Sequence, residues 1–201
     1  MCEREIELGE KTLRIVQEVN SDVNGVVWDS SLVAIHYLAK SVPLKGLKVL
    51  DLGSGTGVSA VAAAMLGAAS VCATDLPERL DLIHKNVQLN GEQLGECAVQ
   101  VEVLDWRSPG KEIDEHWDIV LVIDCVYYQE SVRDLLDILK NLQTDAILVA
   151  FEIRDIGEPV LAQEVFLKEI AEFFKIREIE SDELDESYRS DDIRIFWIAR
   201  N

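Results

Sequence analysis

The stretch VLDLGSGTGVSA, residues 49–60, decides the fold class of this chain. An apolar run that contains Asp51 leads into glycines at every second position, Gly53, Gly55 and Gly57. This pattern predicts a buried strand that ends in a tight turn and continues as a helix. In an open α/β sheet, ligands bind beyond the carboxyl ends of the strands, and glycine lets a ligand approach the main chain. We therefore expect a ligand site at this turn.

The spacing of the glycines narrows the class of ligand. A dinucleotide turn has the pattern GxGxxG, and a P-loop ends in GK followed by Ser or Thr. This stretch has neither pattern, and the helix expected after it contains no lysine for a phosphate. A nucleoside without phosphates fits better, while a purely structural turn stays open as an alternative.

Strand and helix patterns alternate on both sides of this stretch. This order predicts a doubly wound α/β sheet with helices on both faces, and two strands close together at the end predict an antiparallel addition. The expected strands span residues 47–53, 70–76, 98–106, 118–126, 145–153, 175–180 and 193–200. The expected helices span residues 28–42, 57–68, 77–91, 130–142 and 158–174, the first with Asp29 or Ser30 as its cap.

The length and composition indicate a single domain over residues 1–201. The chain has 201 residues, of which 48% are hydrophobic, and this is enough for one buried core. Two alternating segments, residues 4–8 and 13–19, flank a glycine and predict a hairpin. We expect this hairpin to form an N-terminal extension over residues 1–24. No linker or repeat marks a second domain.

The charge balance bears on the partners of the protein. The sequence has 19 basic and 38 acidic side chains, and its formal charge of −19 repels nucleic acid and anionic membranes. The acidity either serves solubility or attracts a basic partner. No apolar window is long enough to span a membrane, and the four cysteines are scattered. We expect a cytoplasmic protein that binds neither nucleic acid nor a membrane.

Two acids near the expected turn favour one cofactor. Asp75 ends the second expected strand, eighteen residues after Gly57, where a carboxylate can accept hydrogen bonds from both ribose hydroxyls. A helix cap before Pro77 is the alternative role. Asp51 lies at the mouth of the first strand, where its charge can meet an ammonium group. A glycine turn, a ribose acid and an acid near a cation describe S-adenosylmethionine better than NAD.

Trp106 follows the third expected strand and has two interpretations. It can cover an adenine ring while Asp105 or a main-chain amide meets the adenine amino group. It can equally be an ordinary core tryptophan.

Several segments together resemble a known family. They are GVVWDSSLVAIHYL (25–38), residues 49–68, ATDLPE (73–78), VLDW (103–106), IDCVYYQES (123–131) and DESYRSDDIRIFWIAR (185–200). In this order they resemble the seven-strand protein-lysine methyltransferases of the methyltransferase-like 21 group. The resemblance implies a Rossmann-like seven-stranded methyltransferase domain, with a mostly parallel sheet and an antiparallel edge strand. It also implies S-adenosylmethionine as cofactor and a protein substrate. The likeness is greatest to members acting on a chaperone-type ATPase, the valosin-containing protein.

The resemblance assigns roles to individual positions. It implies cofactor binding by Trp28, Gly53, Ser54, Gly55, Asp75, Trp106 and Ile123, and the pattern of the turn adds Asp51 and Gly57. The family has a smaller residue where this chain has Ile123. A main-chain contact with the cofactor is therefore expected there.

Asp124 and Tyr127 match the D-x-x-Y motif of the family and are the expected catalytic residues. Methyl transfer mainly requires that a neutral amine is aimed at the methyl carbon. The resemblance places Asp124 where its carboxylate can orient the amine, while Tyr127 and Trp28 exclude water and favour loss of the lysine proton. Cys125 and Val126 stand where enzymes for planar amides carry Pro-Pro, so a flexible aliphatic amine is the expected acceptor.

Other candidates have weaker support. Glu152 and Arg154 either shape the substrate entrance or form a surface ion pair. Tyr188 and Arg189 either touch substrate or have a structural role. The histidines lack metal-ligand spacing, so we expect no metal.

Two other functions stay open. The protein could methylate another amine, such as a small molecule, an arginine or an N-terminus, or it could be a cofactor-binding interaction protein without turnover. We expect a monomer, and the sequence does not indicate how many methyl groups are added.

Overall fold

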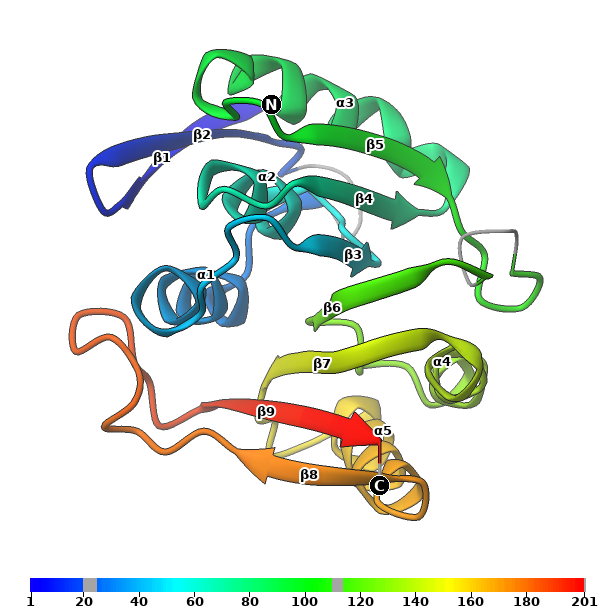
Figure 1. Cartoon of the computed structure of the whole chain (residues 1–201). Coiled ribbons are helices and arrows are strands. Elements are labelled where there is room, and N and C mark those ends of the chain that lie inside the picture. The colour runs from blue at the N-terminus through cyan, green and yellow to red at the C-terminus, as the bar shows by residue number, and fades with distance from the viewer. Residues whose placement is uncertain (20–24, 110–113, 201) are drawn as a thin grey trace.

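The computed structural model describes residues 1–19, 25–109 and 114–200, and its strands form two sheets (Figure 1). One is an antiparallel hairpin of β1 and β2, and the other has seven strands in the order β5-β4-β3-β6-β7-β9-β8. The strands are β1 (Cys2–Leu8), β2 (Lys11–Gln17), β3 (Lys48–Leu52), β4 (Ser70–Asp75), β5 (Ala98–Val103), β6 (His116–Ile123), β7 (Gln143–Glu152), β8 (Phe174–Glu178) and β9 (Ile193–Arg200).

The α/β fold with seven strands and an N-terminal hairpin is confirmed. Strands β5, β4, β3, β6 and β7 are parallel, and β9 is antiparallel to both of its neighbours. The expected antiparallel strand is therefore β9, which lies second from the edge, between β7 and β8. The last part of the expected extension, residues 20–24, lies outside the described residues, as does residue 201.

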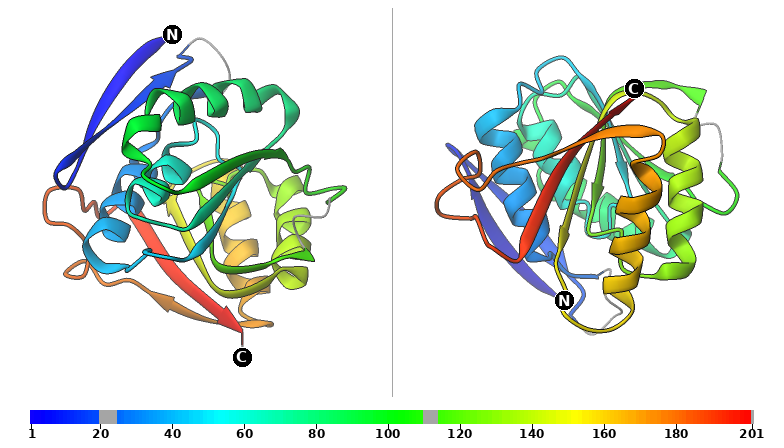
Figure 2. Two further views of the ribbon diagram at one scale, coloured as in Figure 1. Left: turned by 45° about the horizontal axis from the view of Figure 1, so that its top comes forward. Right: turned by 90° about the horizontal axis from the view of Figure 1, so that it is seen from below.

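Helices cover both faces of the large sheet. Figure 2 shows α1, α2 and α3 on one side and α4 and α5 on the other. The helices are α1 (Asp29–Ser41), α2 (Val58–Met65), α3 (Leu80–Leu89), α4 (Gln129–Asn141) and α5 (Glu158–Ile170). Short 3-10 turns, Pro77–Arg79 and Gly91–Gln93, flank α3, so the helix expected over residues 77–91 is divided. Among the described residues, no helix combines the length and apolar character that crossing a membrane requires.

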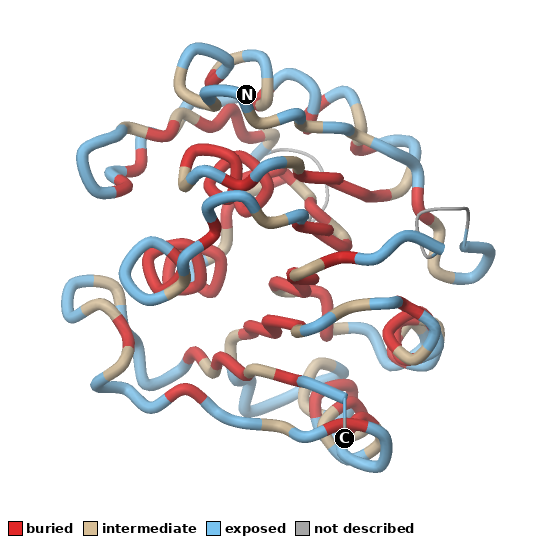
Figure 3. The backbone as a smooth tube through the Cα atoms, in the orientation of Figure 1, coloured by how far each residue is buried: buried red, intermediate tan, exposed pale blue. Residues whose placement is uncertain are grey.

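The apolar pattern of each helix explains which face it buries. In α2 all eight residues are buried, and four of them are alanine, so the helix can approach the sheet closely. In α4 the buried side chains Val132, Leu135, Leu136 and Leu139 recur at helical spacing, with charged residues between them. Buried residues gather along the central strands and in α2 (Figure 3). Two apolar clusters therefore lie on opposite faces of the sheet.

The chain order of the strands places a crevice at the centre of the sheet. From β3 the chain proceeds through β4 to β5 at one edge, and β6 then returns to the other side of β3. At such a switch point the connections leave in opposite directions and open a crevice beyond the carboxyl ends of the strands. Gly53 follows β3 there, and Asp124 follows β6.

Side-chain amides of α3 and the turn after it pair with the free edge of the hairpin. Asn86 and Asn90 each bond to the amide and carbonyl of a β2 residue, Val16 and Arg14, at 2.7 to 3.0 Å. Gln93 donates to the carbonyl of Thr12 at 2.7 Å. Four helical residues rise about 6 Å and two strand residues about 7 Å, so the two spacings nearly match. The amides thus satisfy the edge of β2 as a third strand would.

Candidate active site

Two cavities meet at the carboxyl ends of β3 and β6. The first, the Trp106 cavity, has a volume of about 500 Å³ and is lined by Asp75, Trp106 and the start of α4, among others. The second, the Trp28 cavity, measures about 440 Å³ and is lined by Trp28, the glycine turn and the start of α5. The residues that line both are Gly53, Asp124, Tyr127 and Tyr128. Each cavity has the size of a small-molecule site.

The glycine turn has the left-handed backbone that its sequence predicts. Gly53, Gly55 and Gly57 have φ angles of +65°, +57° and +79°. A Cβ atom at Gly53 would lie 2.9 Å from Cys125 Sγ and 3.2 Å from Trp106 Cζ2, so that position has no room for a side chain. Gly53, Ser54 and Gly55 line the Trp28 cavity. Gly57 lines neither cavity and instead forms the N-cap of α2.

Asp75 is fixed by two main-chain amides. Its carboxylate accepts hydrogen bonds from the N–H groups of Gly55, at 2.7 Å, and Leu76, at 2.8 Å. Burial raises its pKa, and the two amides act in the opposite direction. The bond to Gly55 ties the end of β4 to the glycine turn, and the carboxylate borders the Trp106 cavity. This placement fits the expected ribose contact better than a role as a helix cap alone.

The surroundings of Trp106 suit both roles that the sequence leaves open. It is partly buried, packs against the apolar cluster of the α4 and α5 face, and also lines the cavity. Asp105 is bound by the guanidinium of Arg107 at 2.6 Å, and this partner lowers the Asp105 pKa. The Asp105 carboxylate is therefore already engaged.

Asp51 lies behind the glycine turn and lines neither cavity. Its carboxylate is buried and accepts a hydrogen bond from Ser59 Oγ at 2.7 Å, and its carbonyl accepts bonds from Ser54 and Thr74. Burial raises its pKa to about 6. Asp51 therefore holds the turn from inside the core, and the expected meeting of its charge with an ammonium group stays a prediction.

Asp124 has an unusual backbone. Its φ of +57° is the only left-handed value among the non-glycine residues that the structure describes. Its carboxylate accepts a hydrogen bond from Ser30 Oγ, in the first turn of α1. Burial raises the Asp124 pKa to about 6, and the Ser30 bond opposes this rise. Such strained residues concentrate at functional sites.

The bond from Ser30 corrects the expected start of α1. Trp28 is the N-cap, and no side chain caps the helix. The Ser30 hydroxyl donates to Asp124 instead.

Aromatic and charged side chains form the wall around Asp124. The Trp28 cavity is lined by Trp28, Ile123 and Tyr127, three of the residues that the resemblance assigns to the site. The ring centroids of Tyr127 and Tyr128 lie 4.5 Å apart. Arg154 forms an ion pair with Glu152 at 2.6 Å, and its guanidinium carbon lies 5.9 Å from the centre of the Trp28 ring. The ion pair is present and lines the cavity, and the role of Glu152 and Arg154 at the substrate entrance stays a prediction.

Tyr188 and Arg189 line neither cavity. The Tyr188 ring stacks on His36 at 3.4 Å, and the ring nitrogens of His36 lie 2.8 Å from the carbonyls of Leu32 and Glu7. This arrangement fastens the loop before β9 to α1 and the hairpin. It favours the structural role for both residues.

Sequence reasoning missed other residues of the site. These are Ser30, which holds Asp124, and Thr56, Glu158 and Gln163, which line the Trp28 cavity. Glu158 is the first residue of α5, the helix that follows β7 in the chain, and Gln163 lies in the second turn of that helix. The general rule that loops after parallel strands form the site would have found them.

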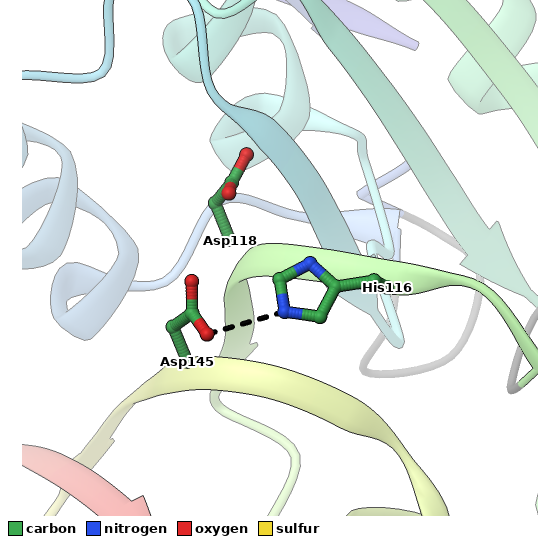
Figure 4. A group of neighbouring side chains, drawn as sticks. All are labelled: His116, Asp118 and Asp145. Carbon is green, nitrogen blue, oxygen red and sulfur yellow. Dashed lines mark hydrogen bonds and ion pairs between the residues drawn. The ribbon is translucent and has the colours of Figure 1, made fainter.

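A second polar group lies at the opposite ends of the strands. In the described parts of the chain, one cluster has the composition of a metal site, and it consists of His116, Asp118 and Asp145 (Figure 4). His116 is the first residue of β6, two residues before the expected start of that strand, and its Nε2 lies 3.1 Å from Asp145 Oδ1. Asp118 accepts a hydrogen bond from the Lys48 amide. Both His116 and Asp145 are exposed, as in ordinary surface ion pairs, so the cluster does not support a metal assignment.

The residues around the two cavities fit the expected cofactor. Asp75, held by two amides, presents acceptors for hydroxyl groups, and the half-buried Trp106 presents an aromatic surface beside it. Gly53, where there is no room for a side chain, lines both cavities. The cations that line the cavities, Arg107 and Arg154, are each already paired with a carboxylate, Asp105 and Glu152.

Comparison with known proteins adds an independent line of evidence. Residues 7–173 match a family model described as lysine methyltransferase. The chain is 34% identical to the protein N-lysine methyltransferase METTL21A of Danio rerio over 184 residues, covering 89% of this chain and 78% of that protein. It is 29% identical to EEF1A lysine methyltransferase 3 of Xenopus tropicalis over 194 residues, covering 94% of this chain and 81% of that protein. Across six curated relatives, the matched part spans 58% to 81% of their own lengths.

A solved structure shares the fold. The ribosomal protein L11 methylase of Lactobacillus delbrueckii subsp. bulgaricus has a TM-score of 0.62 and 20% identity, with 98% of this chain and 97% of that chain covered. At this identity the likeness concerns the fold alone.

Proposed function

The chain belongs to the lysine methyltransferase family, and from this premise we propose that it transfers a methyl group from S-adenosylmethionine to a lysine side chain of a partner protein. The match to METTL21A confirms the resemblance to the methyltransferase-like 21 group. The observation that carries the proposal is the Trp28 cavity, where Asp124, Tyr127 and Trp28 lie beside the glycine turn.

The proposed cofactor site spans both cavities. Asp75 and Trp106 would hold the ribose and adenine, while the turn at Gly53–Gly55 and the indole of Trp28 would hold the amino-acid part. S-adenosylmethionine, when bound, supplies a methyl group on a positively charged sulfur, ready for displacement by an amine. Ile123 lines the same cavity and would contribute its main chain to the cofactor site.

Asp124 is proposed to aim the acceptor. Its carboxylate accepts the N–H groups of the lysine amine, and Ser30 fixes the orientation of that carboxylate. The rings of Tyr127 and Trp28 border the same cavity and exclude water from the amine. Correct aim is the main requirement of this displacement, because the reactants are then already in line.

Loss of the lysine proton depends on opposing charges in the Trp28 cavity. The Asp124 and Glu152 carboxylates favour the charged ammonium form, whereas desolvation and the cationic Arg154 favour the neutral amine. Arg154 lies close enough to Asp124 to act on its pKa, and it lowers that pKa. It therefore weakens the hold of Asp124 on a lysine proton.

We propose a chaperone-type ATPase as the protein substrate, on the likeness to members acting on the valosin-containing protein. We further propose that the enzyme is a cytoplasmic monomer that binds neither nucleic acid nor a membrane. The excess of acidic side chains disfavours binding to nucleic acid and anionic membranes. The four free cysteines are typical of a reducing compartment such as the cytoplasm.

The test is a labelling experiment with the purified protein. Labelled S-adenosylmethionine and a cell extract are incubated with the native chain or with Asp124→Ala, and modified residues are identified by mass spectrometry. One lysine-labelled band that Asp124→Ala abolishes supports the proposal. Label on an arginine, an N-terminus or a small molecule indicates the alternative acceptors. No label, with cofactor binding intact by calorimetry, indicates an interaction protein.

A further inference from the structure

Exposed apolar side chains gather beside the Trp28 cavity. Of the large hydrophobic residues exposed in the described part of the chain, Tyr128, Ile153, Ile156 and Leu161 come from the segments that follow β6 and β7. Ile156 is 85% exposed and Leu161 51%. Tyr128 lines both cavities. We name these four residues the acceptor rim, together with the neighbouring acids Glu130, Glu152, Asp155, Glu158, Asp191 and Asp192.

Hydrogen bonds bring the segments of the rim together. The Gln129 amide donates to Glu158 Oε1 at 3.0 Å, which joins the start of α4 to the start of α5. The Ile153 amide donates to the Asp192 carbonyl at 2.6 Å, which adds the loop before β9. Leu161 stands three residues after Glu158 on α5, and residues at this spacing share one face of a helix. These contacts place the starts of α4 and α5 and the loop before β9 close to one another, and Tyr128, Glu152 and Glu158 from these segments line the Trp28 cavity or border it.

The rim is strongly acidic. Residues 128–130, 152–158 and 191–192 contain six acids, Glu130, Glu152, Asp155, Glu158, Asp191 and Asp192. Arg154 is the single base in these segments, and Glu152 pairs with it. The rim thus presents apolar side chains within a field of negative charge.

We propose that the acceptor rim docks an extended segment of the substrate in which the target lysine is flanked by basic and aliphatic residues. This inference rests on the proposed function, since it places the target lysine in the Trp28 cavity. Charge complementarity selects the basic flanks, because unlike charges across an interface steer binding and like charges oppose it. The apolar members of the rim select the aliphatic residues, since each buries area that is otherwise exposed to water.

The test uses two labelled peptides of equal length with a central lysine. One has arginine and leucine around the lysine, and the other has glutamate and serine. Binding is measured by fluorescence anisotropy in the presence of S-adenosylhomocysteine. The first peptide is expected to bind at least about tenfold more tightly, and added salt should reduce its advantage. Equal binding of both peptides, or binding of neither, overturns the proposal.

Matched variants locate the effect on the protein. Asp155→Lys is expected to weaken the basic peptide several-fold, whereas Glu172→Lys, an equal charge change beyond the other end of α5, should not. Ile156→Ser should weaken the peptide without changing its salt dependence. If Asp155→Lys and Glu172→Lys behave alike, general charge and not the rim attracts the peptide.

Two further measurements separate substrate docking from dimerisation and from failure of the cofactor site. Sedimentation that shows a dimer dissociated by Ile156→Ser would overturn the docking proposal, because the rim would then join two copies of the chain. Calorimetry with S-adenosylhomocysteine tests the cofactor site independently. If the cofactor binds and extract protein is methylated but the two peptides bind equally, only the rim proposal is rejected. If the cofactor does not bind, the proposed function is rejected.

Discussion

Ser30 Oγ donates a hydrogen bond to the Asp124 carboxylate, and this bond joins the first turn of α1 to the end of β6. The two residues are 94 positions apart in the chain. The bond stabilises the ionised carboxylate, because the hydroxyl donates to its negative charge. It also connects the helix that follows Trp28 to the residue expected to orient the acceptor.

Removal of this hydroxyl should shift the pH profile. The Asp124 pKa is about 6 and is lowered by the Ser30 bond, so Ser30→Ala should raise it further. Because the ionised carboxylate accepts the amine, activity falls as pH drops through this pKa. The acid limb of kcat/KM should therefore lie near pH 6 in the native enzyme and move to higher pH in Ser30→Ala.

Asp124→Asn is the control for this profile. It should lower kcat by about 100-fold through misplacement of the amine, and the remaining activity should lack the acid limb. Persistence of that limb in Asp124→Asn would assign it to another group.

Asp75 should be required for cofactor affinity. Asp75→Ala removes the acceptor for the ribose hydroxyls and the anchor of the Gly55 amide, so S-adenosylhomocysteine should bind about 10-fold to 100-fold more weakly by calorimetry. Asp105→Ala serves as the neighbouring comparison. Its carboxylate is already bound by Arg107, and a much smaller loss is expected. An equal loss in both variants would contradict the assignment of the ribose to Asp75.

Gly53→Ala separates backbone strain from lack of space. Gly53 and Gly9 have nearly the same φ, +65° and +64°, but only Gly53 has atoms within 4 Å of an added Cβ. Gly9→Ala should lower the unfolding free energy by about 1 kcal/mol, the cost of the left-handed backbone. Gly53→Ala should lower it further and also reduce cofactor binding, because Cys125 and Trp106 must shift. Denaturant unfolding and calorimetry of both variants check this, and equal effects would mean that strain alone acts.

The buried Asp51 should make stability depend on pH. Its pKa rises from 3.8 to about 6 on folding, so between these values the folded state binds more protons than the unfolded state. Stability therefore falls as pH rises through this range. Between about pH 5 and about pH 7.5 the loss from this one group is about 1 kcal/mol. Asp51→Asn, compared by denaturant unfolding at both pH values, should reduce the dependence by that amount. An unchanged slope would place the responsible group elsewhere.

Much of the fold could be predicted from the sequence because its signals are local. The alternation of apolar strands with amphipathic helices identified the elements of the large sheet, and the glycines at 53 and 55 placed a site after β3. The position of β9 between β7 and β8 depends on pairing between distant segments, which no local pattern records.

What the sequence could not predict at the site has the same physical origin. Asp51 and Asp75 are both acids at the ends of neighbouring strands, and the sequence suggested that both face the ligand. Ser59 Oγ draws the Asp51 carboxylate into the core, whereas amides hold that of Asp75 at the cavity. Likewise, Ser30 resembles a helix cap until Asp124 is brought beside it by the fold. Side-chain direction at such positions depends on tertiary partners.

The amide of Asn86 contacts both the hairpin and the glycine turn. It bonds to the main chain of Val16 and donates to the carbonyl of Thr56 at 2.8 Å. Local opening of β2 therefore removes two of the bonds that orient the Asn86 amide toward Thr56, and a ligand that rigidifies the turn adds to the free energy of opening the hairpin. Hydrogen exchange at the Val16 amide would then slow when the cofactor binds. The N-terminal hairpin would report occupancy of a site that it does not line.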